Sequence, residues 1–367
     1  MSKPRLGLGL IGTGNIGRAH LMGLIALRDA KLLDIEIAAL CDIDEESLRS
    51  TANLVEPTSV YGDYNELVAD ENVNVVYICT PTNKHSDMVK STAKLKKDIF
   101  CEKPLAHSAP QAQELFAVVK SAQVKASVGL VLRFDPFLLF AKELIAEKDF
   151  GTPMLAHIRD DQHFPVDYIY YSQWRGDLSI AGGGTLIEHS IHDIDILNWF
   201  FGDITSVFAK VGFFSEREVE DQASLIITHR NGVVSTIDSI WHMVERPSER
   251  VLEFFFEKGY IGITLESGRR WLDYQLRGEG PVRIHLENAN GALLKTLGVT
   301  QKNMSLEAVD ALVTVGTERY SALSYSFLKS VLSKKEPSPN FLDALAAHKV
   351  VDAAYESANL NRPVDLL

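Results

Sequence analysis

The first third of the chain alternates short apolar runs with longer stretches whose apolar residues recur every three or four positions. Short apolar runs are typical of strands buried on both faces, and the longer periodic stretches are typical of amphipathic helices. The alternation therefore predicts a parallel sheet covered by helices. The predicted strands cover residues 5–11, 34–44, 73–81, 97–104 and 125–134, and helical patterns cover residues 18–29, 85–96 and 109–122.

The pattern changes after residue 204, where strand-like runs follow one another closely. Asn231 and Gly232 stand between two of these runs, and Asn-Gly in this context is a strong signal for a hairpin of two antiparallel strands. Helical patterns return at about 317–334 and 340–360. The strand-like runs cover residues 205–214, 220–230, 232–242, 251–258 and 259–267.

A glycine-rich turn joins the first predicted strand to the first predicted helix. Its sequence, GTGNIG, has the G-x-G-x-x-G spacing of a dinucleotide-binding turn. In such a turn Gly12 permits the tight bend, Gly14 leaves room for a pyrophosphate and Gly17 lets the helix approach the strand. The free N–H groups of the helix then bind the phosphates. An ordinary glycine-rich loop is the alternative. The residues predicted to contact the cofactor here are Gly12, Thr13, Gly14, Asn15, Ile16 and Gly17.

The second predicted strand leads to Asp42, which lies 25 residues after Gly17. This is close to the spacing of about 20 expected for the acid that binds the adenosine ribose. A carboxylate there accepts both ribose hydroxyls and repels a 2′-phosphate, so Asp42 favours NAD without excluding NADP. Ile43 stands beside it instead of an arginine, which points the same way. The alternative is a turn residue, because DIDEE also resembles a helix start.

Composition restricts the class of protein. The chain has 367 residues, of which 46% are hydrophobic, and this suits a globular protein of about two domains. A net charge of −12 argues against non-specific nucleic-acid and anionic-membrane partners. No apolar run reaches the roughly 18 residues of a membrane span. Cys41, Cys79 and Cys101 show no C-x-x-C spacing, so we expect neither disulfides nor a structural zinc. Free cysteines of this kind suit a cytoplasmic location.

The stretch AGGGTLIEHSIHDIDILNWFFGD, residues 181–203, places acids and histidines among apolar residues. This interleaving predicts partial burial, and buried ionisable groups usually need a partner or a chemical role. The groups concerned are Glu188, His189, His192, Asp193 and Asp195.

Four stretches together resemble one family. GTGNIG, CTPTNKH, EKP and AGGGTLIEHSIHDID occur in the order seen in the Gfo/Idh/MocA oxidoreductases, named after glucose–fructose oxidoreductase and inositol dehydrogenase. The resemblance covers nearly the whole chain, including the ending NLNRPVDL. It implies an α/β fold, with an N-terminal NAD(P)-binding Rossmann domain over residues 1–125. An α/β substrate and oligomerisation domain with a large, mostly antiparallel open sheet would follow over residues 126–367. Because an uncovered sheet face is a liability in a monomer, we expect a homodimer or homotetramer formed through this sheet.

The resemblance also implies the catalytic residues. The family pattern has the lysine of EKP, and an aspartate followed four residues later by a histidine; here these positions are Lys103, Glu188 and His192. Positions 188 and 192 are expected at i and i+4 of one helix, so both side chains would share one face. His192 is predicted to take the proton when an alcohol is oxidised. Lys103 would bond the same oxygen, or act as the base itself. Glu188 would bond the substrate or orient His192.

The sequence departs from the family pattern at two positions. Glu188 replaces the usual aspartate, and Ser190 stands where many members have glycine. The longer carboxylate predicts a pocket geometry different from that of inositol dehydrogenase. Two plainer interpretations stay open: Lys103 as a solvated loop lysine and His192 as a core histidine. No metal is expected, because Glu188, His192 and Asp193 lack a third well-spaced ligand.

Further cofactor candidates follow the third and fourth predicted strands, at the sheet edge where ligands bind. Pro81 would shape the turn beneath the nicotinamide. His85 would lie near the ribose, or would only begin a helix. The predicted cofactor contacts in these two loops are Thr80, Pro81, Asn83, His85, Glu102 and Lys103.

The predicted substrate contacts are Lys103, Arg133, Glu188 and His192. Arg133, at the expected domain junction, would bond a substrate oxygen, or form a hinge salt bridge instead. The polar and aromatic stretch 159–177 suits either a sugar ring or an oligomer contact, so its members receive no single role. They are Asp160, His163, Tyr168, Trp174 and Arg175.

These features predict a cytoplasmic NAD(P)-dependent oxidoreductase that acts on a secondary alcohol of a sugar, polyol or related cyclic compound. Two alternatives stay open. One is a non-catalytic regulator of the same fold that senses NAD(P) or a sugar. The other is a redox-assisted glycosidase or epimerase that retains its NAD. Lys103 and His192 argue against the regulator, because a sensor needs no proton acceptor.

Overall fold

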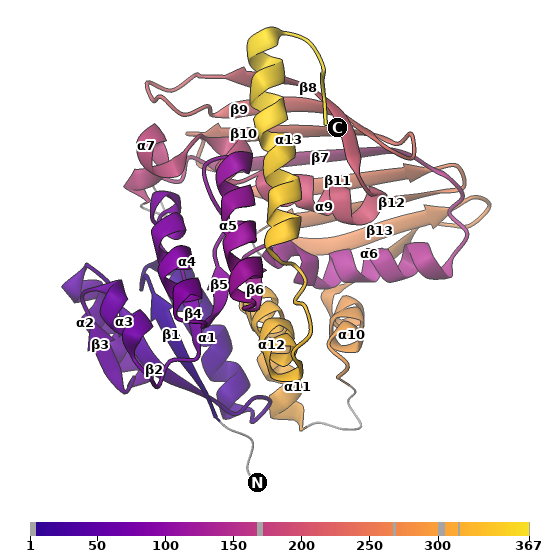
Figure 1. Cartoon of the computed structure of the whole chain (residues 1–367). Coiled ribbons are helices and arrows are strands. Elements are labelled where there is room, and N and C mark those ends of the chain that lie inside the picture. Colours follow the sequence, from indigo (N-terminus) through magenta and orange to yellow (C-terminus); the bar gives the residue numbers. More distant parts are fainter. Residues whose placement is uncertain (1–4, 167–171, 267–268, 300–304, 315, 367) are drawn as a thin grey trace. The chain divides into compact units, whose positions relative to one another are not determined.

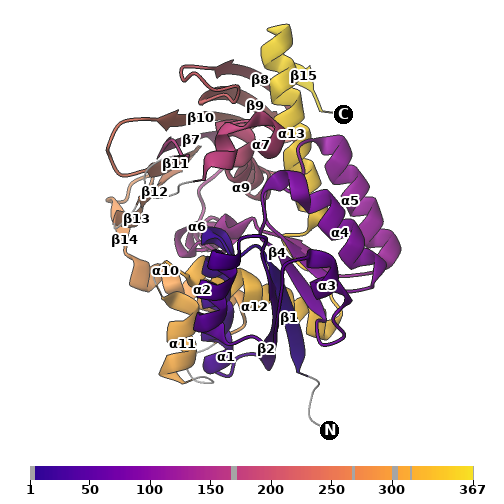
Figure 2. The same ribbon diagram turned by 90° about the vertical axis from the view of Figure 1, so that its left-hand side faces the viewer.

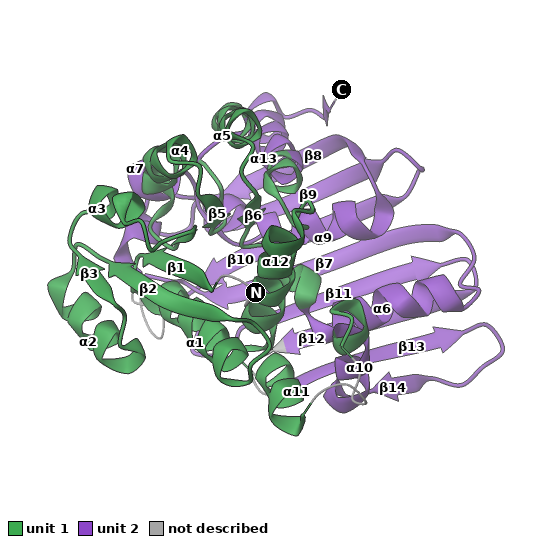
Figure 3. Ribbon diagram, turned by 60° about the horizontal axis from the view of Figure 1, so that its bottom comes forward, with its two compact units in different colours: residues 1–106, 110–134, 294–345 green, residues 107–109, 135–293, 346–367 purple. Residues whose placement is uncertain are grey.

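The computed structural model describes residues 5–166, 172–266, 269–299, 305–314 and 316–366. The chain forms two compact units (Figure 3). The first unit comprises residues 1–106, 110–134 and 294–345, and the second comprises residues 107–109, 135–293 and 346–367. The return of residues 294–345 to the first unit was not anticipated from the sequence. The boundary after residue 125 stays a prediction, because a compact unit is not the same as an independently folding domain.

The first unit is built on a parallel sheet. Within its described residues the sheet has six strands in the order β3-β2-β1-β4-β5-β6, and each adjacent pair runs parallel. The order reverses direction at β1 and β4, so the carboxyl ends of these strands form the crevice in which doubly wound folds bind ligands. The strands are β1 (Leu6–Ile11), β2 (Ile35–Cys41), β3 (Ser59–Tyr61), β4 (Val75–Ile78), β5 (Asp98–Cys101) and β6 (Ala126–Val128).

Helices cover both faces of this sheet. Figure 2 shows α1, α11 and α12 on one side and α3, α4 and α5 on the other. The late helices α11 and α12 pack on α1, which is how the returning segment completes the first unit. The helices are α1 (Asn15–Asp29), α2 (Glu45–Val55), α3 (Tyr64–Ala69), η1 (Thr82–Lys84), α4 (His85–Lys94), α5 (Ala109–Ala122), η2 (Val131–Phe134), α11 (Leu306–Val313) and α12 (Glu318–Ser333).

The second unit is built on a larger sheet. Its described strands follow the order β14-β13-β12-β11-β7-β10-β9-β8-β15. β7 and β10 run parallel, and the other paired strands described are antiparallel. The strands are β7 (Pro153–His163), β8 (Ile204–Gly212), β9 (Gln222–His229), β10 (Val234–His242), β11 (Glu249–Phe256), β12 (Gly259–Glu266), β13 (Arg269–Leu276), β14 (Val282–Ile284) and β15 (Val364–Asp365). The α/β fold class, parallel first and mostly antiparallel later, is confirmed.

The hairpin at Asn231–Gly232 joins β9 to β10. Gly232 has a φ of +88°, a left-handed conformation that glycine adopts without steric cost. The antiparallel register that follows pairs Val234 with Thr228.

One face of the second sheet is packed and the other is partly exposed. Side chains alternate between the two faces along β11. Leu252 and Phe254 on one face are fully buried, whereas Phe255 on the other face is 39% exposed. Helices α6 and α9 lie on the packed face (Figure 1). The bounds of these two helices are α6 (Pro136–Glu147) and α9 (Ile191–Phe201). The second unit also contributes η3 (Gln173–Gly176), α7 (Leu178–Ala181), α8 (Thr185–Glu188) and the start of α10 (Leu286–Thr296). Helix α13 (Phe341–Leu360) begins in the first unit and ends in the second.

None of the described helices combines the length and the apolar composition needed to cross a bilayer.

Candidate functional site

The three glycines of GTGNIG have distinct roles in the first unit. Gly12 has a φ of +95°, and a Cβ there would lie 2.5 Å from the carbonyl oxygen of Cys79. A Cβ on Gly17 would lie 1.9 Å from the carbonyl oxygen of Gly12, so helix α1 can approach the turn only without a side chain. A Cβ on Gly14 would meet no described atom within 4 Å. Gly14 begins α1 with no side-chain cap, which leaves the helix N-terminus open to an anion.

Asp42 follows β2 with its carboxylate already fixed by the chain. The backbone N–H of Thr13 donates to Asp42 Oδ2 at 2.6 Å, and the Thr13 hydroxyl donates to the same oxygen at 2.8 Å. The N–H of Asp44 donates to Oδ1 at 3.0 Å. Ile43 beside it is 93% exposed. The fixed carboxylate of Asp42 suits the ribose hydroxyls of NAD, and the uncapped start of α1 beside it suits the phosphates.

His85 links the loops that follow β4 and β5. Its side chain is buried, with Nδ1 2.9 Å from the carbonyl oxygen of Pro104 and Nε2 2.9 Å from that of Thr80. His85 also begins α4, which was the alternative left open for it. Contacts of Thr80, Pro81, Asn83 and His85 with a cofactor stay predictions, and Asn83 is the exposed member of the four.

Glu102 is buried beside the predicted catalytic lysine. Its Oε1 lies 2.7 Å from Nε2 of His20, and its Oε2 accepts the backbone N–H of Lys103 at 3.0 Å. Burial favours the neutral acid, but the bond and charge of His20, with Lys103, lower the pKa of Glu102 below its usual value. A Cβ on Gly129 would lie 2.4 Å from this carboxylate, so the glycine makes room for it. Glu102 therefore supports the Lys103 backbone, and its contact with NAD stays a prediction.

Arg133 forms an ion pair inside the first unit. It is 8% exposed, and its guanidinium donates to Asp343 Oδ1 at 3.1 Å and to the Ser338 hydroxyl at 3.3 Å. Arg133 thus forms a salt bridge between η2 and the start of α13, within the first unit, and its role at a hinge stays a prediction. A substrate contact for Arg133 stays a prediction.

In the second unit, the expectation that one helix carries both Glu188 and His192 is wrong. Helix α8 ends at Glu188 and α9 begins at Ile191, with His189 and Ser190 between them. The N–H groups of His189 and Ser190 both point to the carbonyl of Thr185, at 3.1 and 2.9 Å. The second of these bonds spans five residues, which interrupts the regular four-residue pattern. The i, i+4 argument for a shared helical face therefore does not apply.

The glycine triplet is required by packing within the second unit. Gly182 ends α7 with a φ of +86°. A Cβ on Gly183 would lie 2.4 Å from the Tyr355 hydroxyl, and one on Gly184 would lie 1.8 Å from the carbonyl oxygen of Glu220. These contacts give the glycine triplet a structural reason within the second unit.

Glu220 and Tyr355 hold the start of α8. The carboxylate of Glu220 accepts the N–H of Gly184 at 2.7 Å, the N–H of Leu186 at 3.0 Å and the Tyr355 hydroxyl at 2.8 Å. These contacts satisfy two of the helix's free N–H groups. No motif in the sequence indicated either residue, because one lies before a strand and the other within a long helix.

Glu188 and His192 are both buried, at 2% and 7% exposure. Glu188 Oε2 accepts a hydrogen bond from Arg175 Nε at 3.2 Å. Arg175 also stacks on Trp174, with its guanidinium carbon 4.7 Å from the ring centre. Arg175 of the polar and aromatic stretch thus lies beside the predicted carboxylate, and Trp174 lies against its guanidinium. Tyr168 of that stretch lies outside the described residues.

Asp193 and Asp160 share one arginine. Arg250 Nε lies 2.8 Å from Asp193 Oδ1, and Arg250 Nη2 donates to Asp160 Oδ2. His189 Nε2 lies 3.3 Å from the same oxygen of Asp160. Burial and the nearby Asp160 carboxylate raise the pKa of Asp193 to about 8, although the charge of Arg250 acts in the opposite direction. Arg250 and His189 overcome the effect of burial on Asp160 and lower its pKa. The sequence indicated His189 and Asp193 only as members of a buried polar stretch, and it gave no sign of Arg250.

Within the ranges that the structure describes, no group of three His, Cys, Asp or Glu side chains is arranged to hold a metal ion.

Comparison with known proteins gives two family matches. Residues 6–130 match the GFO_IDH_MocA model, described as an oxidoreductase family with an NAD-binding Rossmann fold, and residues 138–262 match the GFO/IDH/MocA C-terminal domain. The chain is 31% identical over 262 residues to myo-inositol 2-dehydrogenase of Thermotoga maritima, which covers 69% of this chain and 74% of that protein. It is 27% identical over 366 residues to inositol 2-dehydrogenase of Rhizobium meliloti, with 98% of each chain covered.

Among solved structures, a levoglucosan dehydrogenase in complex with NADH and levoglucosan superposes with a TM-score of 0.86 at 22% identity, covering 99% of this chain and 100% of that one. This likeness confirms the fold. NAD as the cofactor and oxidoreductase as the class agree with the sequence predictions. With both of its domain models matched in order along the chain, the protein belongs to the Gfo/Idh/MocA family of NAD-binding oxidoreductases.

Proposed function

We propose that the protein oxidises a secondary alcohol of a sugar, polyol or related cyclic compound with NAD. The observation that carries the proposal is the match to an inositol 2-dehydrogenase along 98% of both chains, which includes both family domains. Buried ionisable groups at 188 and 192 agree with it, because a redox site on an alcohol needs a proton acceptor shielded from water.

The proton and the hydride leave the alcohol toward different acceptors. Bound NAD would supply the hydride acceptor, so the residues of the chain have to handle the proton. His192 takes the hydroxyl proton, and Lys103 donates a hydrogen bond that stabilises the negative charge developing on the oxygen. Glu188, kept in place by Arg175, orients His192 or the substrate. In the reverse direction the same groups return the proton.

Asp42 supports the choice of NAD. Its carboxylate is fixed by Thr13 and Asp44, so it cannot easily turn away from a ligand that carries a 2′-phosphate. Repulsion between the two negative groups would therefore disfavour NADP.

The test of the activity is formation of reduced nicotinamide, followed by absorbance, with a panel of inositols, aldoses and anhydrosugars. Turnover with at least one cyclic polyol or sugar is expected. If the purified protein instead carries tightly bound NAD and converts a glycoside or an epimer with no net NADH, the redox-assisted alternative is correct. Binding of NAD and sugars with no conversion of any panel member would support the regulator.

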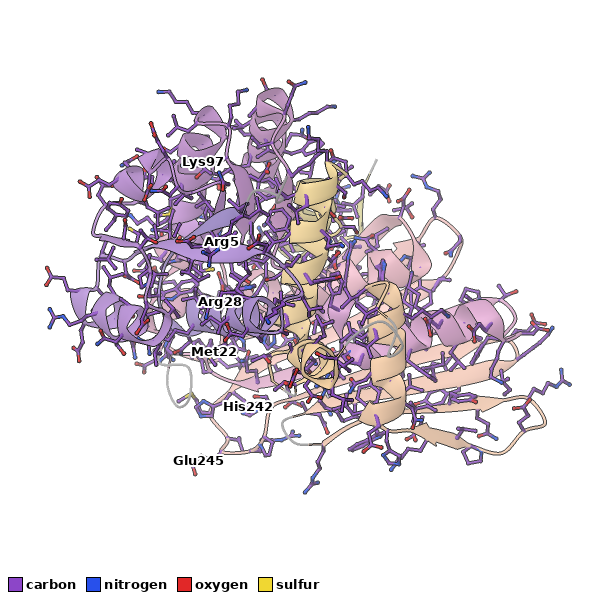
Figure 4. The ribbon with its side chains drawn as sticks, turned by 90° about the horizontal axis from the view of Figure 1, so that it is seen from below. Arg5, Met22, Arg28, Lys97, His242 and Glu245 are labelled. Carbon is purple, nitrogen blue, oxygen red and sulfur yellow. The ribbon has the colours of Figure 1, made fainter. Side chains whose placement is uncertain are left out.

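Lys103→Ala tests the assignment of the site. It should lower kcat severely while NAD affinity changes by no more than about tenfold, or roughly 1.4 kcal/mol. Lys97→Ala is the matched control, because Lys97 stands just before the start of β5 whereas Lys103 follows its end. Lys97 is labelled in Figure 4. The kcat of Lys97→Ala should equal that of the wild type. Full turnover by Lys103→Ala would remove Lys103 from the mechanism.

The proposed assembly is a homodimer or homotetramer formed through the exposed face of the second sheet, in the cytoplasm. Apolar side chains on that face support it, because a patch of this kind marks an interaction surface. They are Leu155, Ile226, Val234, Ile240 and Phe255, each between 37% and 52% exposed. Light scattering of the wild type and of Ile226→Lys tests the interface, and dissociation of the variant is expected.

A further inference from the structure

The second unit contains a buried charge network that the proposed chemistry does not use. Its members are Asp160 on β7, Arg250 on β11, Asp193 on α9 and His189 in the break between α8 and α9. Asp160, Arg250 and Asp193 are 3%, 9% and 0% exposed. Groups of this kind are costly to bury, so the network needs a reason beyond stability.

The network ties the helix break to two adjacent strands. Asp160 and Arg250 are direct partners across the antiparallel pair of β7 and β11. Arg250 reaches Asp193 at 2.8 Å, and Asp160 lies 3.3 Å from His189. The strands thus present one cation and one anion to the segment, and each binds a different residue of it.

Each of the two anchored residues directly follows one member of the predicted catalytic pair in sequence. His189 directly follows Glu188, and Asp193 directly follows His192. Between them the chain leaves regular helical hydrogen bonding, so the backbone alone does not fix residues 188–192 as an unbroken helix would. The side-chain contacts replace that constraint.

The two aspartates of the network differ in their affinity for a proton. Asp160, whose pKa is lowered by Arg250 and His189 despite its burial, is the ionised partner of Arg250. Burial raises the pKa of Asp193, so Asp193 is the aspartate that accepts a proton more readily. Removing Arg250 would leave the Asp160 carboxylate buried without its cation, and the segment would have to shift or admit water.

We propose that Arg250 and Asp160 are positioning residues, which hold the segment 188–193 so that Glu188 and His192 meet the substrate. The inference rests on the proposed function for its catalytic consequence. Its structural part, the anchoring, stands independently of any substrate.

The test compares Arg250→Met and Arg250→Lys with the wild-type full chain. Arg250→Met should accelerate amide hydrogen exchange over residues 185–195 and lower kcat by about a hundredfold, with the KM for NAD within about twofold. Arg250→Lys keeps the cation and should recover part of both losses. Asp160→Asn removes the partner on β7 and should give the same exchange pattern as Arg250→Met.

Arg283→Met is the matched control. It removes an Arg–Asp pair of the same sheet, between Arg283 on β14 and Asp273 on β13, where both side chains are exposed. It should leave kcat and the exchange of residues 185–195 unchanged.

Two readouts separate the possible failures. Unchanged exchange over residues 185–195 in Arg250→Met overturns the anchoring, whether or not the wild type turns over a polyol. Faster exchange with an unchanged kcat overturns the positioning role. If Arg250→Met does not fold, Arg250→Lys and Asp160→Asn decide by the same criteria. A wild type that converts no substrate refutes the proposed function but leaves the exchange test intact.

Discussion

Nε2 of His20 lies 2.7 Å from Oε1 of Glu102, and both side chains are buried in the first unit. His20 comes from helix α1, whereas Glu102 follows strand β5 and accepts the backbone N–H of Lys103. The rings of Tyr77, Phe100 and Tyr320 surround the imidazole, with centroids between 4.7 and 5.9 Å from it. The predicted catalytic lysine is therefore attached, through its neighbour, to the helix that begins at the glycine turn.

The first prediction concerns this pair. His20→Phe would leave the buried Glu102 carboxylate with the Lys103 N–H but without its histidine partner, and the free energy of unfolding should fall by about 3–5 kcal/mol. Because the wild-type pKa of Glu102 is lowered, the stability it contributes is present above the unfolded-state pKa of glutamate and is lost as pH falls. The difference in the free energy of unfolding between the wild type and His20→Phe should therefore become smaller toward acid pH. Urea unfolding followed by circular dichroism at several pH values measures it.

The control for this experiment is Arg5→Gln. It removes the contact of Arg5 with Glu36 at 3.0 Å, in which both side chains are exposed; Arg5 is labelled in Figure 4. An exposed pair contributes at most about 1 kcal/mol. An equal loss of stability in His20→Phe and Arg5→Gln would contradict the importance given to the buried pair.

The second prediction separates two glycines of one turn. Gly17→Ala should destabilise the protein by about 1–3 kcal/mol, because the new Cβ would lie 1.9 Å from the carbonyl oxygen of Gly12. Gly14→Ala meets open space and should leave the melting temperature unchanged. It should still weaken NAD binding by about tenfold or more, because the methyl group occupies the place of the pyrophosphate. Calorimetric titration with NAD and thermal melts distinguish the two; a Gly14→Ala protein that binds NAD normally would place the phosphates elsewhere.

The third prediction concerns the choice of cofactor. Asp42→Ala combined with Ile43→Arg removes the repelling carboxylate and adds a cation, so kcat/KM for NADP relative to NAD should rise by about tenfold or more. Asp44→Asn is the control, because it removes one negative charge two residues away and keeps an N-cap for α2, where Asp44 accepts the N–H groups of Glu46 and Ser47. If Asp44→Asn changes the preference as strongly, net charge and not the position of Asp42 sets it.

The fourth prediction follows from Asp193. Its pKa is raised to about 8 by burial and by Asp160, so between the unfolded-state pKa and about 8 the folded protein binds the extra proton. Wild-type stability should therefore fall as pH rises through this window, and Asp193→Asn should not show that fall. The unfolding free energy of Asp193→Asn, measured relative to that of the wild type, should therefore rise from about pH 5 to about pH 8, by at most roughly 1.4 kcal/mol per pH unit.

Asp203→Asn serves as the comparison for Asp193→Asn. Asp203 forms a pair with Arg230 in which both side chains are more than 70% exposed. A pH profile of stability parallel to the wild type is expected for it. If Asp193→Asn is equally parallel to the wild type, Asp193 does not hold the proton.

The parallel sheet and the glycine turn could be predicted because their signals are local. The period of the apolar residues distinguishes strand from helix, and the glycine spacing marks one bend in which a Cβ at Gly12 or Gly17 would clash with the backbone. The Asn231–Gly232 hairpin is equally local. Each of these features depends on residues within a few positions of one another.

The break after Glu188 could not be predicted, because its causes are remote. The letters from Thr185 to Asp195 are compatible with one continuous helix. The chain departs from it where Glu220 holds the N-terminus of α8 and where Asp160 contacts His189. Arg250, which completes the network, stands in an ordinary strand pattern. Pairings between residues 29 to 90 positions apart are set by the fold of the second unit and leave no local signature.

The return of residues 294–345 has a consequence for protein engineering. Helix α12 lies against α1 so closely that a Cβ on Gly23 would be 3.0 Å from the backbone nitrogen of Ser321. A gene fragment that stops at residue 134 would encode every strand of the six-stranded sheet and yet strip α1 of this cover. The nucleotide-binding half can be excised as a soluble module only if the distant segment is spliced back through a linker.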